Sequence, residues 1–521
     1  MAAVLDRGWP LSTTTSTTYG AVLVVLTIGQ VVLSLGAKLV YNLYFHPLAA
    51  YPGPLLARCS RLWYTNALVR GNLPFVVHQA HEKYGEIVRI APDELAYIDA
   101  RAWKDIYGPR PGRHEIPKDP NFYLNTSVGD VSIIGADSVR HGKLRRLLSH
   151  GFSERALQDQ VPIIQDYVDL FIARLRVLSK KPEPVDIVTW YNFFTFDVIG
   201  DLAFAESFGC LETSKYHPWI DFMFEVIVGG TYKRAADHYP LVGRLMKLLT
   251  PERVKQGVAA HLALMKHKAM HRLELKTDRL DFMTRMAAPD SGLTPEEFIA
   301  SADTILLGGS ETTATLLSGI TYYLLKHPAV LDKLVEEIRT KFSSEEEIDL
   351  VSVNTLDYML ACLNETFRLY PPVPGALPRR TVVGEALAGS YVPPNTTVAI
   401  YHWAMYRTGR HFKRPLEYLP ERWLKESWFE EDDRSVMQSF SYGPRNCIGR
   451  NLAYVEMRLL LARMLFSFDI EATPAIEGWL DQKVYLLWQK PPLWIKLKPR
   501  DVKLRPQVVK LLEQSEQPSA T

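Results

Sequence analysis

One short segment near the C-terminal end, FSYGPRNCIGR at residues 440–450, constrains the fold more than any other part of the sequence. It places Cys447 directly before a stretch whose apolar residues recur at helical intervals. A cysteine in that position faces the positive end of a helix, where backbone N–H groups stabilise a thiolate. Gly443 and Gly449 let the backbone turn sharply, and Arg445 offers a bidentate fork to an acidic group. The segment therefore suits a cysteine that ligates a metal as a thiolate.

An isolated cysteine is more often a buried structural residue, because free cysteine is among the most buried residue types. The pattern around this cysteine favours a ligand instead. Five residues match all the fixed positions of FxxGxRxCxG, namely Phe440, Gly443, Arg445, Cys447 and Gly449. The sequence therefore closely resembles the cytochrome P450 monooxygenases, whose haem-binding signature this is. The resemblance implies haem b (iron protoporphyrin IX) as cofactor, Cys447 as the axial ligand of its iron, and the other four residues around it.

The composition fits one large enzyme domain. The 521 residues contain no visible repeats and no Gly/Ser-rich linker in their central part. Sixty basic and 58 acidic residues give a net charge of +2, which argues against nucleic acid as a partner. The four cysteines form no CxxC pair, which argues against a disulfide framework or a structural zinc site. A reducing compartment is therefore expected.

The N-terminal region contains a candidate membrane anchor. No charged residue lies between Arg7 and Lys38, and residues 21–37 are almost wholly apolar, which is long enough to span a bilayer. A cleaved signal peptide is the alternative, because Ser34 and Gly36 are small enough to precede a cleavage site. Basic residues follow the span, so the positive-inside rule places the main domain in the cytosol.

Most of the remaining chain has the spacing of helices. Apolar residues recur every three or four positions at 161–178, 251–275 and 328–342, whereas short β signals occur at 87–97 and 381–400. These patterns predict a mainly α protein with small β-sheets, which agrees with the fold of the resembled family. The expected order is a lumenal tail at 1–18, a transmembrane anchor at 19–40, a proline-rich linker at 41–55, a haem-thiolate catalytic domain at 56–500 and a polar, frayed C-terminal tail at 501–521.

One long helix has a clearly marked start and end. Thr294 as N-cap, Pro295 in the first helical position and Glu297 form a capping box, and Pro328 marks the end. The helix is therefore about 50 Å long at 1.5 Å per residue. Its middle reads GGSETT at residues 308–313. Two glycines inside a helix cost about 1 kcal/mol each against alanine, so they are expected to be compensated, for example by room for a ligand.

In the resembled family this segment is the oxygen-activation site, where a carboxyl and a hydroxyl group deliver protons to dioxygen. Glu311 and Thr312 fall on the acid and alcohol positions. The resemblance therefore implies that they are the catalytic residues. The alternative is a helix contact in which the glycines serve close packing alone.

A second motif, NETFRLYPP, contains Glu365 and Arg368 three residues apart on one helix face. Such pairs are usually solvated and stabilise a protein by less than about 1 kcal/mol. Here the sequence PERW at 420–423 follows and resembles the family's PERF box, so Glu365, Arg368 and Arg422 are expected to form its buried ion triad. That triad holds the haem-binding core and takes no catalytic step.

The haem propionates need cations, and the resemblance suggests where they come from. The family carries a WxxxR element on an early helix, and here that register gives His141 and Arg145. A solvated basic helix face is the alternative. Arg379 and Arg445 are the other expected propionate ligands, and Arg380 could replace Arg379.

The substrate pocket is not encoded in the shared motifs. We expect its walls in the segment at 107–125, on the long helix and after the ExxR motif, although core packing explains the aliphatic candidates equally well. The candidates are Phe122, Tyr123, Leu306, Leu307 and Val373.

The resemblance covers nearly the whole chain and is closest to microsomal enzymes of filamentous fungi. It implies a single-pass protein of the endoplasmic reticulum membrane that hydroxylates, epoxidises or repeatedly oxidises a lipophilic terpenoid, polyketide or alkaloid. The implied partners are O2, membrane lipid, NADPH-cytochrome P450 reductase and, as a further candidate, cytochrome b5. A haem-thiolate isomerase or dehydratase that needs no external electrons and a non-catalytic haem-binding protein are the alternatives. The intact Glu311 and Thr312 favour the monooxygenase.

Overall fold

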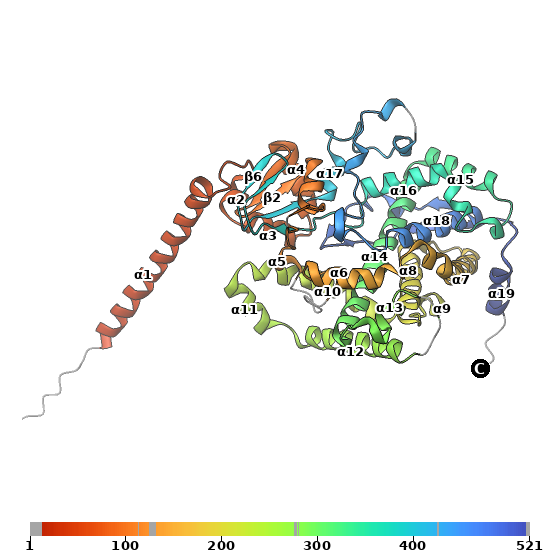
Figure 1. The fold of residues 1–521 in the computed structure, drawn as a ribbon, viewed down its shortest axis with the longest axis horizontal. Coiled ribbons are helices and arrows are strands. Elements are labelled where there is room, and N and C mark those ends of the chain that lie inside the picture. Colours follow the sequence, from red (N-terminus) through yellow and green to blue (C-terminus); the bar gives the residue numbers. More distant parts are fainter. Residues whose placement is uncertain are drawn as a thin grey trace, which may run out of the picture.

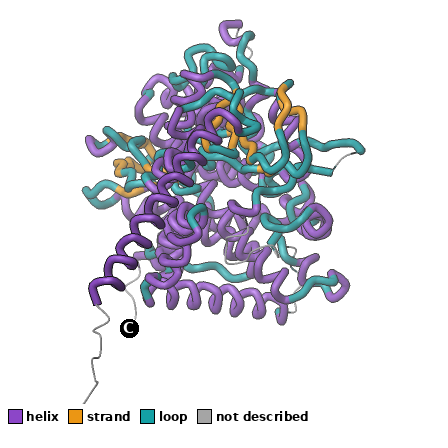
Figure 2. Tube along the Cα trace, turned by 90° about the vertical axis from the view of Figure 1, so that its left-hand side faces the viewer, coloured by secondary structure: helices purple, strands orange, loops and turns teal. Residues whose placement is uncertain are grey.

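The computed structural model describes residues 13–112, 114–123, 132–275, 279, 281–424 and 427–516, so most of the expected N-terminal tail and the last five residues lie outside it. The protein is mainly helical with small β-sheets, as the sequence predicts. Figure 1 shows one long helix, α1, that projects from a body of packed helices. Figure 2 shows the strands gathered in a few small patches among the helices.

The α-helices account for most of the body. They are α1 Thr13–Val40, α2 Leu55–Cys59, α3 Leu62–Val69, α4 Leu73–Tyr84, α5 Pro120–Tyr123, α6 Ser138–Ser149, α7 Glu154–Ser179, α8 Ile187–Phe204, α9 Cys210–Thr213, α10 Pro218–Asp237, α11 Pro240–Leu249, α12 Glu252–Glu274, α13 Thr284–Ala287, α14 Pro295–Lys326, α15 Pro328–Lys341, α16 Asp357–Leu369, α17 His402–Arg407, α18 Arg450–Ser467 and α19 Pro506–Glu516. The predicted helices at 161–178, 251–275 and 328–342 are confirmed as α7, α12 and α15.

The strands are short. They are β1 Ile87–Ala91, β2 Glu94–Tyr97, β3 Val185–Asp186, β4 Arg379–Arg380, β5 Glu385–Leu387, β6 Ser390–Val392, β7 Thr397–Ile400, β8 Phe468–Ala472, β9 Lys483–Val484, β10 Trp488–Gln489 and β11 Trp494–Pro499. A four-stranded sheet has the order β1-β2-β7-β4, in which only β2 and β7 pair in parallel. A three-stranded sheet has the order β3-β11-β8, and β5-β6 and β9-β10 form two-stranded ribbons.

The core has two parts. The larger part is helical and surrounds α14, which packs against α8, α16 and α18. The smaller part lies under the four-stranded sheet. The predicted capping box of α14 is present, because Thr294 Oγ1 accepts from Glu297 N at 3.2 Å and Glu297 Oε2 accepts from Thr294 N at 2.9 Å. The helix ends at Lys326, just before Pro328.

The cysteine segment folds as its glycines predict. A short 3-10 turn, Gly443–Arg445, leads to Cys447, and α18 begins at Arg450. Gly443 has a φ of +76°, and a Cβ atom there would lie 2.0 Å from the carbonyl oxygen of Tyr107. A side chain at Gly443 would therefore clash with backbone.

The C-terminal segment differs from the expected frayed tail. Residues Pro506–Glu516 form α19, which packs against α7 with Val508 fully buried. Arg505 also reaches the buried Asp169, with a distance of 3.1 Å between its Nε and Oδ2. The polar composition concealed a helix whose few apolar residues share one face.

The N-terminal helix is the one described helix that is long and apolar enough to cross a bilayer, over Val22–Phe45. A signal sequence would have the same length and composition. The described side chains of its apolar stretch are exposed, so α1 leaves the packed body. The expected linker begins with a helical turn, Tyr41–Phe45, and Asn42 Nδ2 donates to Cys59 O at 2.8 Å, which fixes the base of α1 on the domain.

The two glycines of α14 provide a matched test of packing. A Cβ atom at Gly309 would lie 2.5 Å from Ile199 Cδ1, whereas at Gly308 it would meet nothing within 4 Å. We expect Gly308→Ala to stabilise the helix by about 1 kcal/mol and Gly309→Ala to destabilise the protein by about 1–3 kcal/mol through overpacking. Thermal unfolding of both variants measures the difference. Equal effects of the two substitutions would contradict this account of Gly309.

Candidate active site

Cys447 is the exposed cysteine of the four, since Cys210 and Cys362 are buried and Cys59 is half-buried. Its backbone N–H donates to Phe440 O at 2.8 Å, which closes the turn before α18. Burial raises the pKa of its thiol, against smaller opposing effects of the Gly449 N–H and the Arg145 guanidinium. Dense protein surrounds the residue, yet Cys447 is exposed, so it borders an open space that we call the recess.

A bare metal ion has no ready site in the described residues. No group of three or more His, Cys, Asp or Glu side chains comes together there in a way that could hold one.

The middle of α14 presents Gly308 and Thr312 on one face, as residues four apart do. Gly308 is exposed, and the Thr312 hydroxyl donates to its carbonyl oxygen at 2.7 Å. Helix α14 packs against α18, the helix that Cys447 precedes. The hydroxyl expected to act in oxygen activation therefore lies on an open face of a helix that is otherwise mostly buried.

Glu311 points elsewhere than its neighbour Thr312. Its side chain is 1% exposed and forms an ion pair with Lys490, which is 3% exposed. Lys490 Nζ also donates to Thr315 Oγ1 at 2.8 Å, and Thr315 Oγ1 donates to Glu311 Oε1 at 3.3 Å. The second carboxylate oxygen, Oε2, is buried without a hydrogen-bond partner. The sequence reasoning missed Lys490, because nothing in its surroundings after β10 announces a contact with α14.

The structure brings Glu365, Arg368 and Arg422 together in a fully buried cluster. Arg368 holds the Glu365 carboxylate with distances of 2.9 and 2.7 Å, and Arg422 Nε lies 3.4 Å from Oε1. Trp423, in the last place of the PERW sequence, donates its indole N–H to Glu365 Oε2 at 2.9 Å. The tryptophan therefore takes part in the polar cluster.

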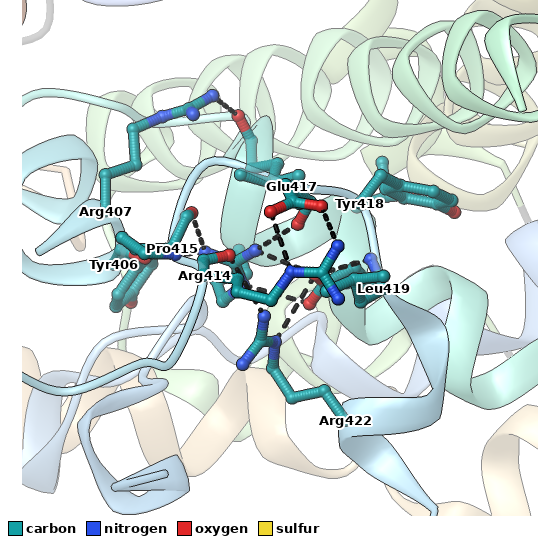
Figure 3. Close-up of polar contacts among 12 residues, drawn as sticks. Tyr406, Arg407, Arg414, Pro415, Glu417, Tyr418, Leu419 and Arg422 are labelled. Atoms are coloured by element: carbon teal, nitrogen blue, oxygen red, sulfur yellow. Dashed lines mark hydrogen bonds and ion pairs between the residues drawn. The ribbon is translucent and has the colours of Figure 1, made fainter. Parts of the chain in front are cut away.

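The surrounding loop completes the cluster. Arg422 also pairs with the buried Asp432, and Arg368 donates to Tyr406 O at 2.9 Å and to Glu417 O at 2.9 Å. Figure 3 shows Arg422 beside this loop, where Arg414 and Glu417 form their own ion pair. Every charge of the cluster has an opposite charge or a carbonyl group beside it.

The four expected propionate ligands lie in one region, where their partners are backbone oxygens, one amide side chain and one carboxylate. His141 and Arg145 stand one turn apart on α6, and Arg145 donates to Asn446 beside Cys447. Arg445 holds Glu115 through two contacts of 3.0 Å and donates to Ala136 O at 2.7 Å. Arg379 donates to Ile116 O at 2.9 Å.

The electrostatics of this region show an excess of positive charge. Burial, reinforced by Arg445, lowers the pKa of His141 to about 4. Burial acts to raise the pKa of Glu115, but the Arg445 guanidinium, with a smaller effect of Arg379, outweighs burial, so the pKa is lowered. Two residues that the sequence reasoning missed, Glu115 and Lys118, belong to this region, and no motif pointed to them.

The pocket candidates fall into three groups. Phe122 and Val373 line a small cavity of about 40 Å³. Tyr123 lines a larger cavity of about 910 Å³. Leu306 is fully buried in the helical core and Leu307 packs against that core, and neither lines these two cavities. Both leucines take part in core packing, and their place in a substrate pocket stays a prediction.

Comparison with known proteins gives a consistent result. The family model described as Cytochrome P450 matches residues 51–497. The chain is 44% identical to cytochrome P450 monooxygenase astA of Talaromyces wortmannii over 88% of this chain and 94% of that protein. It is 44% identical to averantin hydroxylase of Dothistroma septosporum over 91% of each chain. It is 41% identical to trichothecene C-4 hydroxylase of Trichoderma arundinaceum over 92% of this chain and 97% of that protein.

The ion pair on α14 predicts a large effect of a single substitution. Lys490→Met would leave the buried Glu311 carboxylate without its cation, which costs about 3–5 kcal/mol. The double variant Glu311→Gln with Lys490→Met removes both charges and should recover much of that loss. Thermal unfolding of the single and double variants measures both effects. A Lys490→Met variant as stable as the wild type would show that the pair is not formed in solution.

Proposed function

Because the chain belongs to the cytochrome P450 family, we propose that it is a haem-thiolate monooxygenase that inserts oxygen from O2 into a lipophilic small molecule. The observation that carries this proposal is the exposed Cys447 thiol inside an intact family signature. The named hydroxylases among its relatives support hydroxylation in fungal secondary metabolism as the reaction, with a terpenoid, polyketide or alkaloid as substrate class.

The residues fit the haem-thiolate cofactor of the family, which we infer to be haem b. Solvent reaches the Cys447 side chain within dense surroundings, and nearby cations have few carboxylates to balance them. Cys447 would ligate the iron, and Phe440, Gly443 and Gly449 would shape the recess around it. Four side chains would hold the propionates, namely His141, Arg145, Arg379 and Arg445. When bound, haem supplies the activation of O2 and the oxidation of the substrate.

Glu311 and Thr312 have different tasks in this proposal. Thr312 Oγ1 holds the proton nearest the open space, because its side chain lies on the open face of α14 with Gly308. Glu311 is buried one residue away and ion-paired with Lys490, so its carboxylate would relay protons by accepting them from ordered water and passing them on toward Thr312. Both groups move protons at fixed positions.

Glu365, Arg368 and Arg422 act structurally in this proposal. Their buried cluster ties α16 to the loop that precedes the cysteine segment, and its charges balance internally. Removal of one member would leave an uncompensated buried charge. The cluster therefore stabilises the shape of the recess and takes no part in proton transfer.

We propose that residues 19–40 anchor the protein in the endoplasmic reticulum membrane, with residues 1–18 in the lumen and the domain at 56–500 in the cytosol. Helix α11 supports a second membrane contact, because it exposes several large apolar side chains, and Figure 1 shows it on the edge from which α1 leaves. These side chains are Leu241, Val242, Leu245, Met246, Leu248 and Leu249. NADPH-cytochrome P450 reductase, with cytochrome b5 as a second candidate, would deliver electrons from the cytosolic side.

The function is tested by the haem spectrum together with the electron requirement. We expect the wild type to show the carbon monoxide spectrum of thiolate-bound ferrous haem and Cys447→Ala to lose it, since no other thiol borders the recess. Substrates found by their shift of the ferric spin state should be oxidised only with reductase and NADPH. Turnover that persists without electrons would indicate the isomerase or dehydratase, and a thiolate spectrum in Cys447→Ala would place the ligand elsewhere.

The membrane contact of α11 predicts an incomplete effect of truncation. We expect removal of residues 1–40 to leave part of the protein bound to phosphatidylcholine vesicles, because each leucine buried in lipid contributes about 1.5–3 kcal/mol. Adding Leu241→Ser, Leu245→Ser and Leu248→Ser should release the remainder. Leu416→Ser, which alters an exposed leucine in the loop near the ion cluster, is the matched control. Vesicle sedimentation measures the bound fraction, and complete release by truncation alone would contradict a role for α11.

A further inference from the structure

Lys118 lies directly opposite Arg379 on two paired strand segments. The two residues form an isolated antiparallel bridge. Asp119 N donates to Pro378 O at 3.2 Å and Arg380 N donates to Pro117 O at 2.9 Å, so the hydrogen bonds flank the pair. This is the non-hydrogen-bonded type of pair, in which the two side chains share one face and approach most closely. Two cations are thus held side by side.

Like charges opposite each other on paired strands destabilise the pairing unless an anion lies between them. Neither Lys118 nor Arg145 has a carboxylate within ion-pair distance among the described residues. Lys118 Nζ instead donates to Ile134 O and lies 4.6 Å from the centre of the Tyr123 ring. The Nε atom of Arg379 is buried without a hydrogen-bond partner. The face shared by these side chains is therefore short of negative charge.

Among the described residues, Glu115 is the carboxylate that pairs with this group. Glu115 forms a short ion pair with Arg445 and lies 3.8 Å from Arg379. Lys118, Glu115 and Arg445 also line the cavity of about 910 Å³. Of the other charged residues that line this cavity, Arg140 binds Glu297, Glu385 binds Arg110, and Asp137 caps α6 by accepting from Arg140 N. The charge deficit is therefore local to Lys118 and its cationic neighbours.

We propose that Lys118 is a ligand of the haem propionates, added by this chain to the arginines expected from the signature. This inference rests on the proposed haem-thiolate function. The two propionate carboxylates would supply the negative charge that Lys118, Arg379, Arg445 and Arg145 lack. A lysine ammonium bound to a carboxylate forms a charge-assisted hydrogen bond, which is stronger than the contact with a neutral carbonyl group that it now makes.

The proposal predicts that haem binding is coupled to protonation of Lys118. Burial, then Arg445 and Arg379, lower the pKa of Lys118 to about 6, and Glu115 opposes them only in part. His141, which Lys118 also influences, stays neutral at that pH because its own pKa is about 4. Propionates beside Lys118 would raise its pKa, so haem binding takes up a proton above pH 6. The contribution of Lys118 to haem affinity is complete below about pH 6 and declines as the pH rises through the raised value.

Haem transfer from the full-length holoenzyme to excess apomyoglobin tests the proposal. Lys118→Gln keeps a donor for Ile134 O and removes the charge, and we expect its transfer to be about tenfold faster than in the wild type. Lys118→Arg keeps the charge and should transfer within about twofold of the wild-type rate. Lys143→Met is the matched control, because Lys143 binds Gly292 O away from the cationic group, and it should not change the rate.

The pH dependence separates electrostatic binding from a structural role. The ratio of the Lys118→Gln rate to the wild-type rate should be largest near pH 6 and should shrink toward higher pH, whereas a packing defect would give a constant ratio. An unchanged rate in Lys118→Gln, or a ratio independent of pH, would overturn the proposal while the wild type still shows its thiolate spectrum. Loss of that spectrum in the wild type would instead refute the proposed function.

Discussion

Balancing buried charge is the constraint on which the rest of this structure depends. An unpartnered charge inside a protein costs several kcal/mol, so each buried cation or carboxylate needs an opposite charge or a set of hydrogen bonds. Glu365 meets this requirement through Arg368, Arg422 and Trp423, and it thereby joins α16 to the loop that leads to the cysteine segment. The turn before α18 can then hold Cys447 toward open space. The buried Glu365 cluster thus fixes the protein behind the cysteine segment, while Cys447 itself stays exposed.

Some charged groups of the candidate site have an opposite charge beside them, and others do not. Glu311 is neutralised by Lys490, which leaves Thr312 as the polar group on the open face of α14. Among the described residues, the cations around Arg379 are balanced by the Glu115 carboxylate alone. A cofactor with two carboxylates and an iron centre complements this arrangement, because it brings negative charge to the cations and a metal to the thiolate. The cluster of cations with few carboxylate partners therefore supports the proposal that this site binds an anionic cofactor.

The two glycines of α14 have different packing environments. Gly309 permits contact with Ile199 of α8, so close packing, which was the alternative interpretation of the glycines, explains this one. A Cβ atom at Gly308 would meet nothing, and Gly308 lies on the face of Thr312, so close packing does not explain this glycine and room for a ligand stays its prediction. Away from the core, α1 and α11 expose apolar surface that the body does not cover. Exposed apolar surface of this kind marks contact sites, and the proposed membrane contacts of α1 and α11 would cover it.

The sequence by itself determined what depends on local pattern. The helical periodicity, the capping box at Thr294, the turn at Gly443 and the position of Cys447 before α18 follow from residues close together in the chain, whose geometry neighbours decide. Only the tertiary structure decided which charged side chains pair with each other. Lys490 is 179 positions from Glu311, and Glu115 is 330 positions from Arg445. Val508 likewise needed the surface of α7 to turn an apparent tail into a helix. Such pairings depend on how distant segments meet, and short-range periodicity carries no information about that.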